Sequence, residues 1–190
     1  MTSRIIVVTA LLILPVLATA QVKSTPPAKV SFDDFKGLVA QVETHRAKRL
    51  IDLDTFLKMS KEPGVIILDS RSTFRYERIH VKGARHLSFT DFTQTNLRKV
   101  IPSFETTILI YCNNNFDGNQ VDFASKISSP GDSESAQLAS QEKPIMLALN
   151  IPTYINLYGY GYRNVYELKE LVNVNDPRIR FEGSMATAKY

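Results

Sequence analysis

The sequence predicts an α/β domain in which helices flank a central, mainly parallel sheet. Three candidate strands carry this prediction: two short apolar runs at residues 65–68 and 108–111, and a third strand candidate at 165–168. The first two contain no charged residue and are rich in β-branched side chains, a pattern typical of parallel strands that are buried on both faces. Helical patterns separate the runs, and strands that alternate with helices favour a parallel sheet.

The composition is that of an ordinary globular domain. Of the 190 residues 44% are hydrophobic and 22% are charged, which is too apolar for a disordered chain. The net charge of +4 is small and the charges are scattered, so nucleic acid is not expected as a partner. A single cysteine excludes an internal disulfide framework and any multi-cysteine metal site. The three histidines lack metal-ligand spacing, and we expect neither a metal nor a cofactor.

Residues 1–20 have the pattern of a cleavable secretory signal peptide. Arg4 precedes an apolar run at 5–17, and Ala18-Thr19-Ala20 is a small-x-small cleavage site before Gln21. The run is short for a membrane span of about 20 residues. We therefore expect a periplasmic or secreted protein with no membrane segment after cleavage, the alternative being an uncleaved anchor.

The remaining chain divides into a flexible lead-in at 21–30 and a domain at 31–190. The domain opens with a predicted helix from Ser31, its N-cap, to near Arg49, with apolar residues at three-and-four spacing. Further predicted elements are a strand at 50–51, a helix at 52–60, a helical or irregular crossover at 89–100, and a helix at 152–157 with Asn150 as its cap.

Residues 113–143 form an insertion of unusual composition. The segment is rich in Asn, Ser, Gly and Pro and poor in large apolar residues. Loops of this length within a compact domain are uncommon and often functional. Residues 121–127 and 144–149 could pair as a hairpin around the tip of the insertion.

Cys112 follows the second apolar run directly. Ligand sites in open α/β sheets lie beyond the carboxyl ends of the strands. A ring of backbone N–H groups there would lower the pKa of the thiol and bind anions, so we expect a pKa below the ordinary value of about 8.5. The alternative is a cysteine that only packs as a small apolar residue.

Two motifs around this cysteine resemble the signatures of the rhodanese-like domain family. The first is similar to the pattern D-x-R, an aromatic residue and G-H-I-x-G-A, with matches at Asp69, Arg71, Tyr76, His80, Val81, Gly83 and Ala84. The second is similar to the family's closing pattern, with matches at Leu157, Gly161, Tyr162, Asn164, Val165, Tyr166 and Leu168. The resemblance covers about residues 50–168 and implies a rhodanese-like fold.

The resemblance further implies a sulfurtransferase in which Cys112 is the catalytic nucleophile. Active members of the family accept sulfane sulfur as a cysteine persulfide from a small donor (thiosulfate, polysulfide or persulfide) and pass it to a thiol acceptor. The implied cradle for the anion or persulfide is the backbone of Asn113, Asn114, Asn115, Phe116, Asp117 and Gly118. The family's cysteine loop is compact and often carries a basic residue, whereas here no basic residue precedes Lys126.

Two other functions remain open for such a chain. One is a non-catalytic binding or interaction module, with the insertion at 113–143 as the surface for a protein partner. The other is a phosphatase or arsenate-reductase-like member that binds a tetrahedral oxyanion; against it, the loop lacks the arginine that such chemistry uses.

Asp69 and Arg71 are the remaining candidate residues. Arg71 has two interpretations: it attracts anions at the rim of the site, or it pairs structurally with a nearby carboxylate. Asp69 stands at the end of its predicted strand, where a carboxylate commonly caps a turn.

Overall fold

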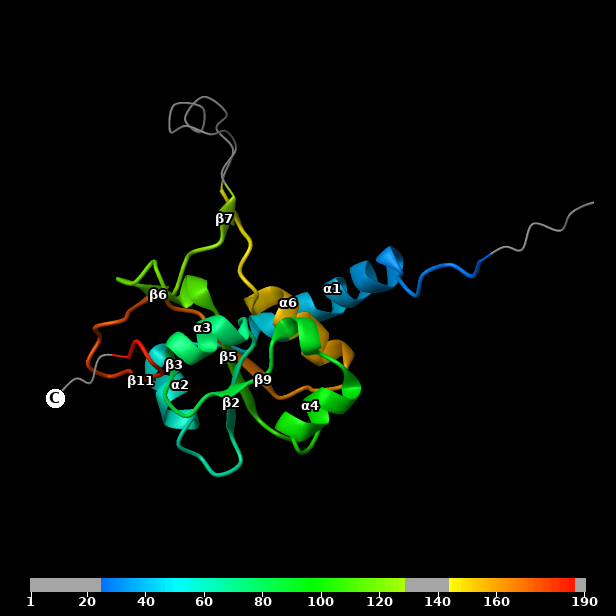
Figure 1. Cartoon of the computed structure of the whole chain (residues 1–190). Coiled ribbons are helices and arrows are strands. Elements are labelled where there is room, and N and C mark those ends of the chain that lie inside the picture. The colour runs from blue at the N-terminus through cyan, green and yellow to red at the C-terminus, as the bar shows by residue number, and fades with distance from the viewer. Residues whose placement is uncertain (1–24, 129–143, 187–190) are drawn as a thin grey trace, which may run out of the picture. The chain divides into compact units, whose positions relative to one another are not determined.

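A five-stranded parallel sheet lies at the centre of the protein (Figure 1). The structure is a computed structural model, and it describes residues 25–128 and 144–186. The strand order is β1-β9-β5-β2-β4, and every neighbouring pair runs parallel. The strands are β1 (Leu50–Ile51), β2 (Ile66–Asp69), β4 (Arg85–His86), β5 (Ile108–Tyr111) and β9 (Val165–Leu168). The predicted α/β class is confirmed, whereas β4, which is only two residues long, was not predicted.

Helices cover the sheet, and most of them lie where the pattern predicted them. They are α1 (Phe32–Ala47), α2 (Leu53–Met59), α3 (Thr73–Arg78), α4 (Gln94–Val100) and α6 (Asn150–Gly159), with the 3-10 turns η1 (Phe89–Asp91) and η2 (Asn113–Asn115). Asp52 caps α2 by accepting a hydrogen bond from the Thr55 N–H at 2.8 Å. Helix α3 lacks a clear apolar period, and the sequence did not predict it.

Within the described residues, three two-stranded ladders lie outside the central sheet. They are β3 (His80–Val81) with β11 (Phe181–Glu182), β6 (Phe116–Asp117) with β10 (Val172–Asn173), and β7 (Ile127–Ser128) with β8 (Ile145–Met146). The pair β6–β10 is parallel, and the other two pairs are antiparallel.

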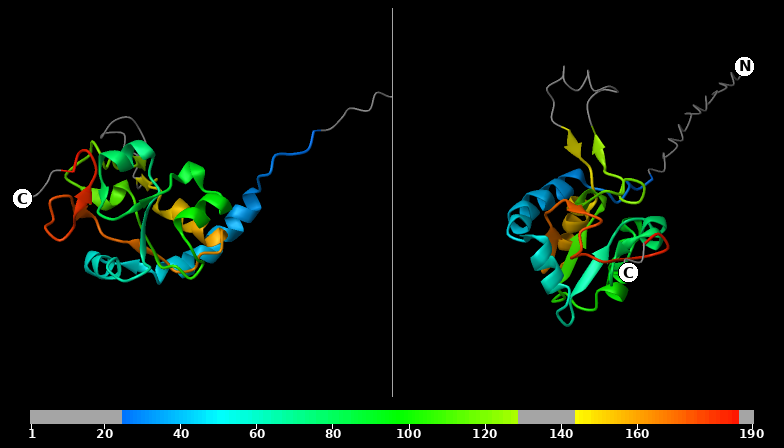
Figure 2. Two further views of the ribbon diagram at one scale, coloured as in Figure 1. Left: turned by 60° about the horizontal axis from the view of Figure 1, so that its bottom comes forward. Right: turned by 90° about the vertical axis from the view of Figure 1, so that its left-hand side faces the viewer.

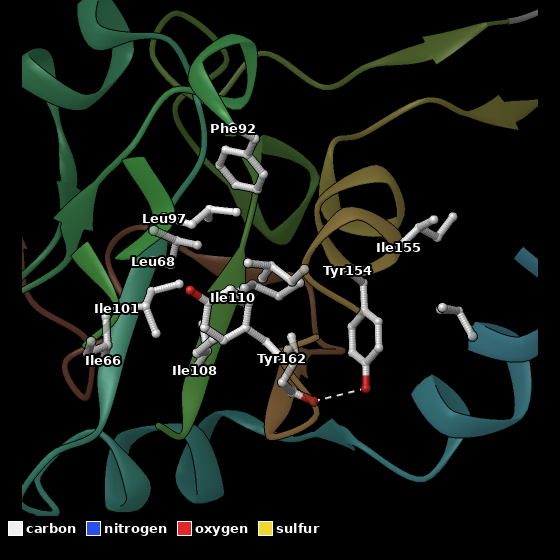
Figure 3. Close-up of a cluster of buried hydrophobic side chains, with 13 residues drawn as sticks. Ile66, Leu68, Phe92, Leu97, Ile101, Ile108, Ile110, Tyr154, Ile155 and Tyr162 are labelled. Atoms are coloured by element: carbon white, nitrogen blue, oxygen red, sulfur yellow. Dashed lines mark hydrogen bonds between the residues drawn. The ribbon is translucent and has the colours of Figure 1, made fainter. Parts of the chain in front are cut away.

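Side chains alternate along the strands between two hydrophobic cores. In β5, Ile108 and Ile110 face one core, and Leu109 and Tyr111 face the other. The first core contains residues of α1, α4 and α6, and Figure 3 shows it, including the hydrogen bond from the Tyr154 hydroxyl to the Val165 carbonyl. The second core contains residues of α2, β3 and the segments after β6 and β10. Because both faces are covered, most positions of the strands are apolar. The buried charged exceptions, Asp69 in β2 and Glu167 in β9, each form an ion pair, with Arg71 and Arg46 respectively.

Helix α1 forms as predicted but buries less of its apolar face than the pattern indicates. Val42 is buried, whereas Phe35 and Val39 remain exposed. The helix lies along α6, where Leu38 packs over Gly159: a Cβ at this glycine would come within 2.9 Å of the Leu38 side chain. Only a narrow strip of the predicted apolar face of α1 therefore contacts α6.

A hairpin is present at the base of the insertion, as predicted, but residues 121–126 do not belong to its ladder. Among the described residues, β7 and β8 form the ladder, and they lie side by side outside the sheet (Figure 2). Phe123 was assigned to the hairpin, but it is fully buried in the second core. The tip of the insertion at residues 129–143 and the predicted signal peptide at 1–20 lie outside the described residues. Within the described part of the chain, no helix is both long enough and apolar enough to span a membrane.

Candidate active site

Cys112 lies at the carboxyl end of β5, the middle strand of the sheet. The residue is only 1% exposed. Its backbone is extended and leads directly into η2. The expected position at a strand end is therefore confirmed, and the central place of β5 lets neighbouring strands and helices surround the thiol.

Helix α6 meets the thiol despite the insertion that precedes it. The backbone N–H of Leu149, at the N-terminus of α6, donates a hydrogen bond to Cys112 Sγ at 3.3 Å. Leu149 is 37 residues further along the chain. A helix N-terminus stabilises negative charge through its free N–H groups, so this contact favours a thiolate or a persulfide anion at Cys112.

Asn115 holds the backbone at Cys112 in place. Its side-chain oxygen accepts hydrogen bonds from the Cys112 N–H at 2.9 Å and from the Asn150 side chain at 2.8 Å. Its side-chain nitrogen donates to the carbonyls of Leu168 and Glu170. The amide thus links the cysteine to the end of β9 and to α6. Asn150 was predicted as the cap of α6, but its side chain serves this network instead, and Leu149 occupies the N-cap position.

The pKa of Cys112 is raised above its ordinary value, which is opposite to the expectation from sequence. Burial is the largest cause, because it disfavours the charged thiolate. Hydrogen bonds from the backbone at Leu149 and Asn113 lower the pKa, and so do the charges of Lys126 and Arg71. In the unliganded protein, desolvation outweighs these groups.

Only part of the predicted cradle surrounds the thiol. Asn113 lines the pocket that contains Cys112, and the backbone N–H of Asn115 faces the cysteine side chain. The side chain of Asn114 turns toward Lys126. The last three predicted residues lie elsewhere, since Phe116 and Asp117 form β6 and Gly118 lines a separate cavity. The turn η2 ends the cysteine loop after three residues, and the sequence contains no local signal for this early end.

Arg71 and Asp69 form a buried ion pair next to Cys112. Arg71 Nη2 and Asp69 Oδ2 are 2.7 Å apart, and the side chains are 2% and 0% exposed. The Asp69 carboxylate also accepts hydrogen bonds from the Arg71 backbone N–H and the Tyr111 hydroxyl. Arg71 donates in addition to the Ile79 carbonyl and to Asn113 Oδ1. These contacts support the structural interpretation of Arg71 and the turn-capping interpretation of Asp69.

A pocket of about 420 Å³ opens at Cys112. Residues from the loop after β2, from α3, from η1 and the residue before it, from the cysteine loop and from the segment before β7 line it together with the N-terminus of α6. The lining residues are Ser70, Arg71, Ser72, Arg75, Ser88, Phe89, Thr90, Cys112, Asn113, Ala124, Ser125, Lys126 and Leu149. Sequence reasoning missed Arg75 and the hydroxyl groups, because no local signal brings α3 and η1 to the cysteine. Among the described residues, no cluster of metal-ligating side chains occurs.

The comparison with protein families matches residues 52–170 to the rhodanese-like domain. Among solved structures, the BH2092 protein from Bacillus halodurans is similar, with 16% identity over 80% of this chain and 88% of the other, at a TM-score of 0.43. A polysulfide-sulfur transferase homodimer from Wolinella succinogenes shares 16% identity over 72% of this chain and 80% of its own, at a TM-score of 0.34. No curated protein sequence matches the chain.

Proposed function

The chain belongs to the rhodanese-like domain family, and from that premise we propose that it is a sulfurtransferase that carries sulfane sulfur as a persulfide on Cys112. The observation that carries this proposal is the contact between Cys112 Sγ and the Leu149 N–H at the start of α6. A nucleophilic thiol at a strand end, facing a helix N-terminus, is an arrangement suited to forming and holding a sulfur anion.

The proposed reaction has two transfers of one sulfur atom. The Cys112 thiolate attacks the outer sulfur of a donor such as thiosulfate, a new S–S bond forms, and the old S–S bond breaks with its electron pair remaining on sulfite. A thiolate acceptor then attacks the outer sulfur of the Cys112 persulfide, takes it as its own persulfide, and releases the Cys112 thiolate. No net oxidant or reductant is needed, and no cofactor takes part.

Mass spectrometry of the intact protein tests the first transfer. The reduced protein is incubated with thiosulfate, polysulfide or a low-molecular-weight persulfide, and we expect a gain of about 32 Da, one sulfur atom, which dithiothreitol removes. The Cys112→Ser variant is the control, because its hydroxyl remains protonated and cannot form a persulfide. A wild-type protein that gains no sulfur from any of the three donors would contradict the proposal.

A non-catalytic interaction module is the second candidate, and burial of Cys112 favours it. The thiol is 1% exposed and its pKa is raised, as expected of a cysteine that only packs. In that case sulfur transfer is absent, and the insertion at 113–143 is the first surface to examine for a protein partner. The mass experiment separates the two candidates.

Export is part of the proposed function. Its support is the pattern of residues 1–20, with the cleavage site at Ala18-Thr19-Ala20. A periplasmic or secreted location also fits a chain with a single cysteine, which cannot form an internal disulfide. N-terminal sequencing of protein recovered from an exported fraction should begin at Gln21. A start at Met1 or Thr2 would refute cleavage.

A further inference from the structure

The first half of the insertion contacts α3 and lines part of the Cys112 pocket. Arg78 forms an ion pair with the buried carboxylate of Asp122, and Arg75 donates to the Val121 carbonyl. Phe123 is fully buried, and the Arg71 guanidinium lies 4.7 Å from the centre of its ring. These contacts hold the segment that follows β6 against α3, and its residues Ala124, Ser125 and Lys126 form one wall of the pocket.

The side chain of Asn114 fixes the backbone position of Lys126 through two hydrogen bonds. Its side-chain nitrogen donates to the Lys126 carbonyl at 3.1 Å, and its side-chain oxygen accepts from the Lys126 N–H at 2.7 Å. The Lys126 carbonyl also accepts a hydrogen bond from the Leu147 N–H at 2.9 Å. Asn114 is two residues from Cys112, so this pair of hydrogen bonds ties the backbone of Lys126 to the cysteine loop.

The charges around the pocket favour an anion. Three cationic side chains line it, and none of the described lining residues is acidic. Arg71 is neutralised by Asp69, and Arg75 is engaged with a backbone carbonyl. Lys126 takes part in none of the ion pairs found within residues 25–128 and 144–186, and its charge acts on Cys112. The Ser72 hydroxyl adds a hydrogen-bond donor, whereas the hydroxyls of Ser70 and Ser88 are hydrogen-bonded to Thr153 and Thr90.

We propose that Lys126, positioned by Asn114, is the specificity-determining cation that binds the anionic end of a small sulfur donor in the Cys112 pocket. This inference rests on the proposed function and assigns its donor class as small anions of the thiosulfate type. The ammonium holds the sulfonate oxygens, and the outer sulfur of the donor then lies toward Cys112. The basic group comes from the insertion, 14 residues after the cysteine, and not from the cysteine loop itself.

Steady-state kinetics with two donors test this role. For Lys126→Met we expect kcat/KM with thiosulfate to fall about tenfold to hundredfold, the loss of one charge-assisted hydrogen bond, mainly through KM. Cysteamine persulfide carries a cation at its organic end, so its kcat/KM should not fall, and Lys126→Glu should raise it. Lys99→Met is the matched control, since Lys99 is exposed on α4 and lies outside the pocket.

The positioning role of Asn114 is tested by a double-mutant cycle. Asn114→Ala should lower kcat/KM for thiosulfate in the wild-type background and cause little further loss in the Lys126→Met background. Equal losses in both backgrounds would show that Asn114 acts independently of Lys126 and would overturn its assignment.

A binding measurement separates failure of this inference from failure of the proposed function. The Cys112→Ser protein, which cannot turn over, is titrated with thiosulfate by calorimetry, and Lys126→Met in that background should weaken binding about tenfold or more. If the wild-type protein transfers sulfur but Lys126→Met behaves as Lys99→Met does, the inference is overturned and the function stands. If anion binding depends on Lys126 but no persulfide forms, only the function is overturned. If neither occurs, both are.

Discussion

Burial and hydrogen bonding act in opposite directions on the Cys112 thiol. The backbone donors and the two nearby cations favour the thiolate, but the almost complete loss of solvent favours the thiol and has the larger effect on the pKa. An anionic donor must therefore bind beside a thiol whose pKa is raised by burial. Neighbouring Arg71 and Asp69 are both buried, and each neutralises the other.

The raised pKa of Cys112 should appear in its alkylation. We expect the rate of reaction with iodoacetamide to rise with pH to a midpoint above the ordinary thiol value of about 8.5. The same protein in denaturant is the control, and its midpoint should return to the ordinary value. A midpoint below it in the folded protein would show that the amide donors outweigh burial.

The same shift links stability to pH. Between the unfolded and the folded pKa of Cys112, the folded state keeps a proton that the unfolded state releases, so the free energy of unfolding should fall as pH rises above about 8.5. Chemical denaturation of the wild type and of Cys112→Ser between pH 7 and 10, a range that spans the thiol pKa, measures it. If the free energy of unfolding changed equally with pH in the two proteins, the raised pKa of Cys112 would be contradicted.

Loss of Arg71 should cost far more stability than loss of an exposed arginine. Arg71→Ala leaves the Asp69 carboxylate buried without its partner, and we expect the free energy of unfolding to fall by about 3–5 kcal/mol. Arg178 is the control, because its ion pairs are exposed and Arg178→Ala should cost less than about 1 kcal/mol. Urea denaturation compares them, and similar losses would refute the structural role of Arg71.

At the scale of elements, the described residues of the insertion belong to two different structures. Its first part enters the second hydrophobic core through Phe116 and Phe123, and the strand β7 that follows pairs with β8 in a hairpin. The strands of the hairpin are exposed and bury little apolar surface. The first part of the insertion, by contrast, is paired with α3 and lines the pocket. Stability and donor binding should both depend on the first part.

Truncation of Phe123 tests whether the first part belongs to the core. Phe123→Ala removes a fully buried ring and should lower the free energy of unfolding by about 3–5 kcal/mol. Val121→Ala, two residues away and 70% exposed, should change it by no more than about 0.5 kcal/mol. Thermal and urea unfolding give both values. A small loss of stability in Phe123→Ala would mean that the first part of the insertion is not packed into the second core.

At the scale of the whole molecule, the C-terminal segment completes the domain by capping α3. The N–H groups of Ser184 and Met185 donate to the carbonyls of Glu77 and Arg78, which a short helix leaves without partners. The strand β11 pairs with β3 next to this contact. The chain thus returns after β9 and β10 to fix the helix that carries Arg75 and Arg78.

Gly183 allows this close approach. A Cβ there would lie 2.6 Å from the Arg78 carbonyl oxygen, and its φ of +121° disfavours any other residue. Gly183→Ala should therefore lower the melting temperature. Gly37→Ala is the control, because nothing lies within 4 Å of a Cβ in that exposed helix position, and it should raise stability by about 0.5–1 kcal/mol. Scanning calorimetry of both variants measures these effects. A Gly183→Ala protein that melts at the wild-type temperature would contradict the close contact.

Elements with strong local patterns could be predicted from the sequence. The mainly apolar strands β2, β5 and β9 follow from burial on both faces, and the capped helix α2 follows from its end-capping residue. The position of Cys112 at a strand end follows as well. By contrast, β4 has two residues and α3 has no buried residue, so neither element has a periodic signal.

The sequence by itself determined the α/β class, the family resemblance and the one cysteine that can act as nucleophile. Only the tertiary structure decided the surroundings of that cysteine, because they depend on contacts between residues far apart in the chain. Leu149 reaches Cys112 from 37 residues away, and Lys126 reaches its pocket through Asn114. The sign of the pKa shift was decided in the same way. Burial is a property of the assembled core, and it outweighs the local N–H groups from which the sequence predicted a lowered pKa.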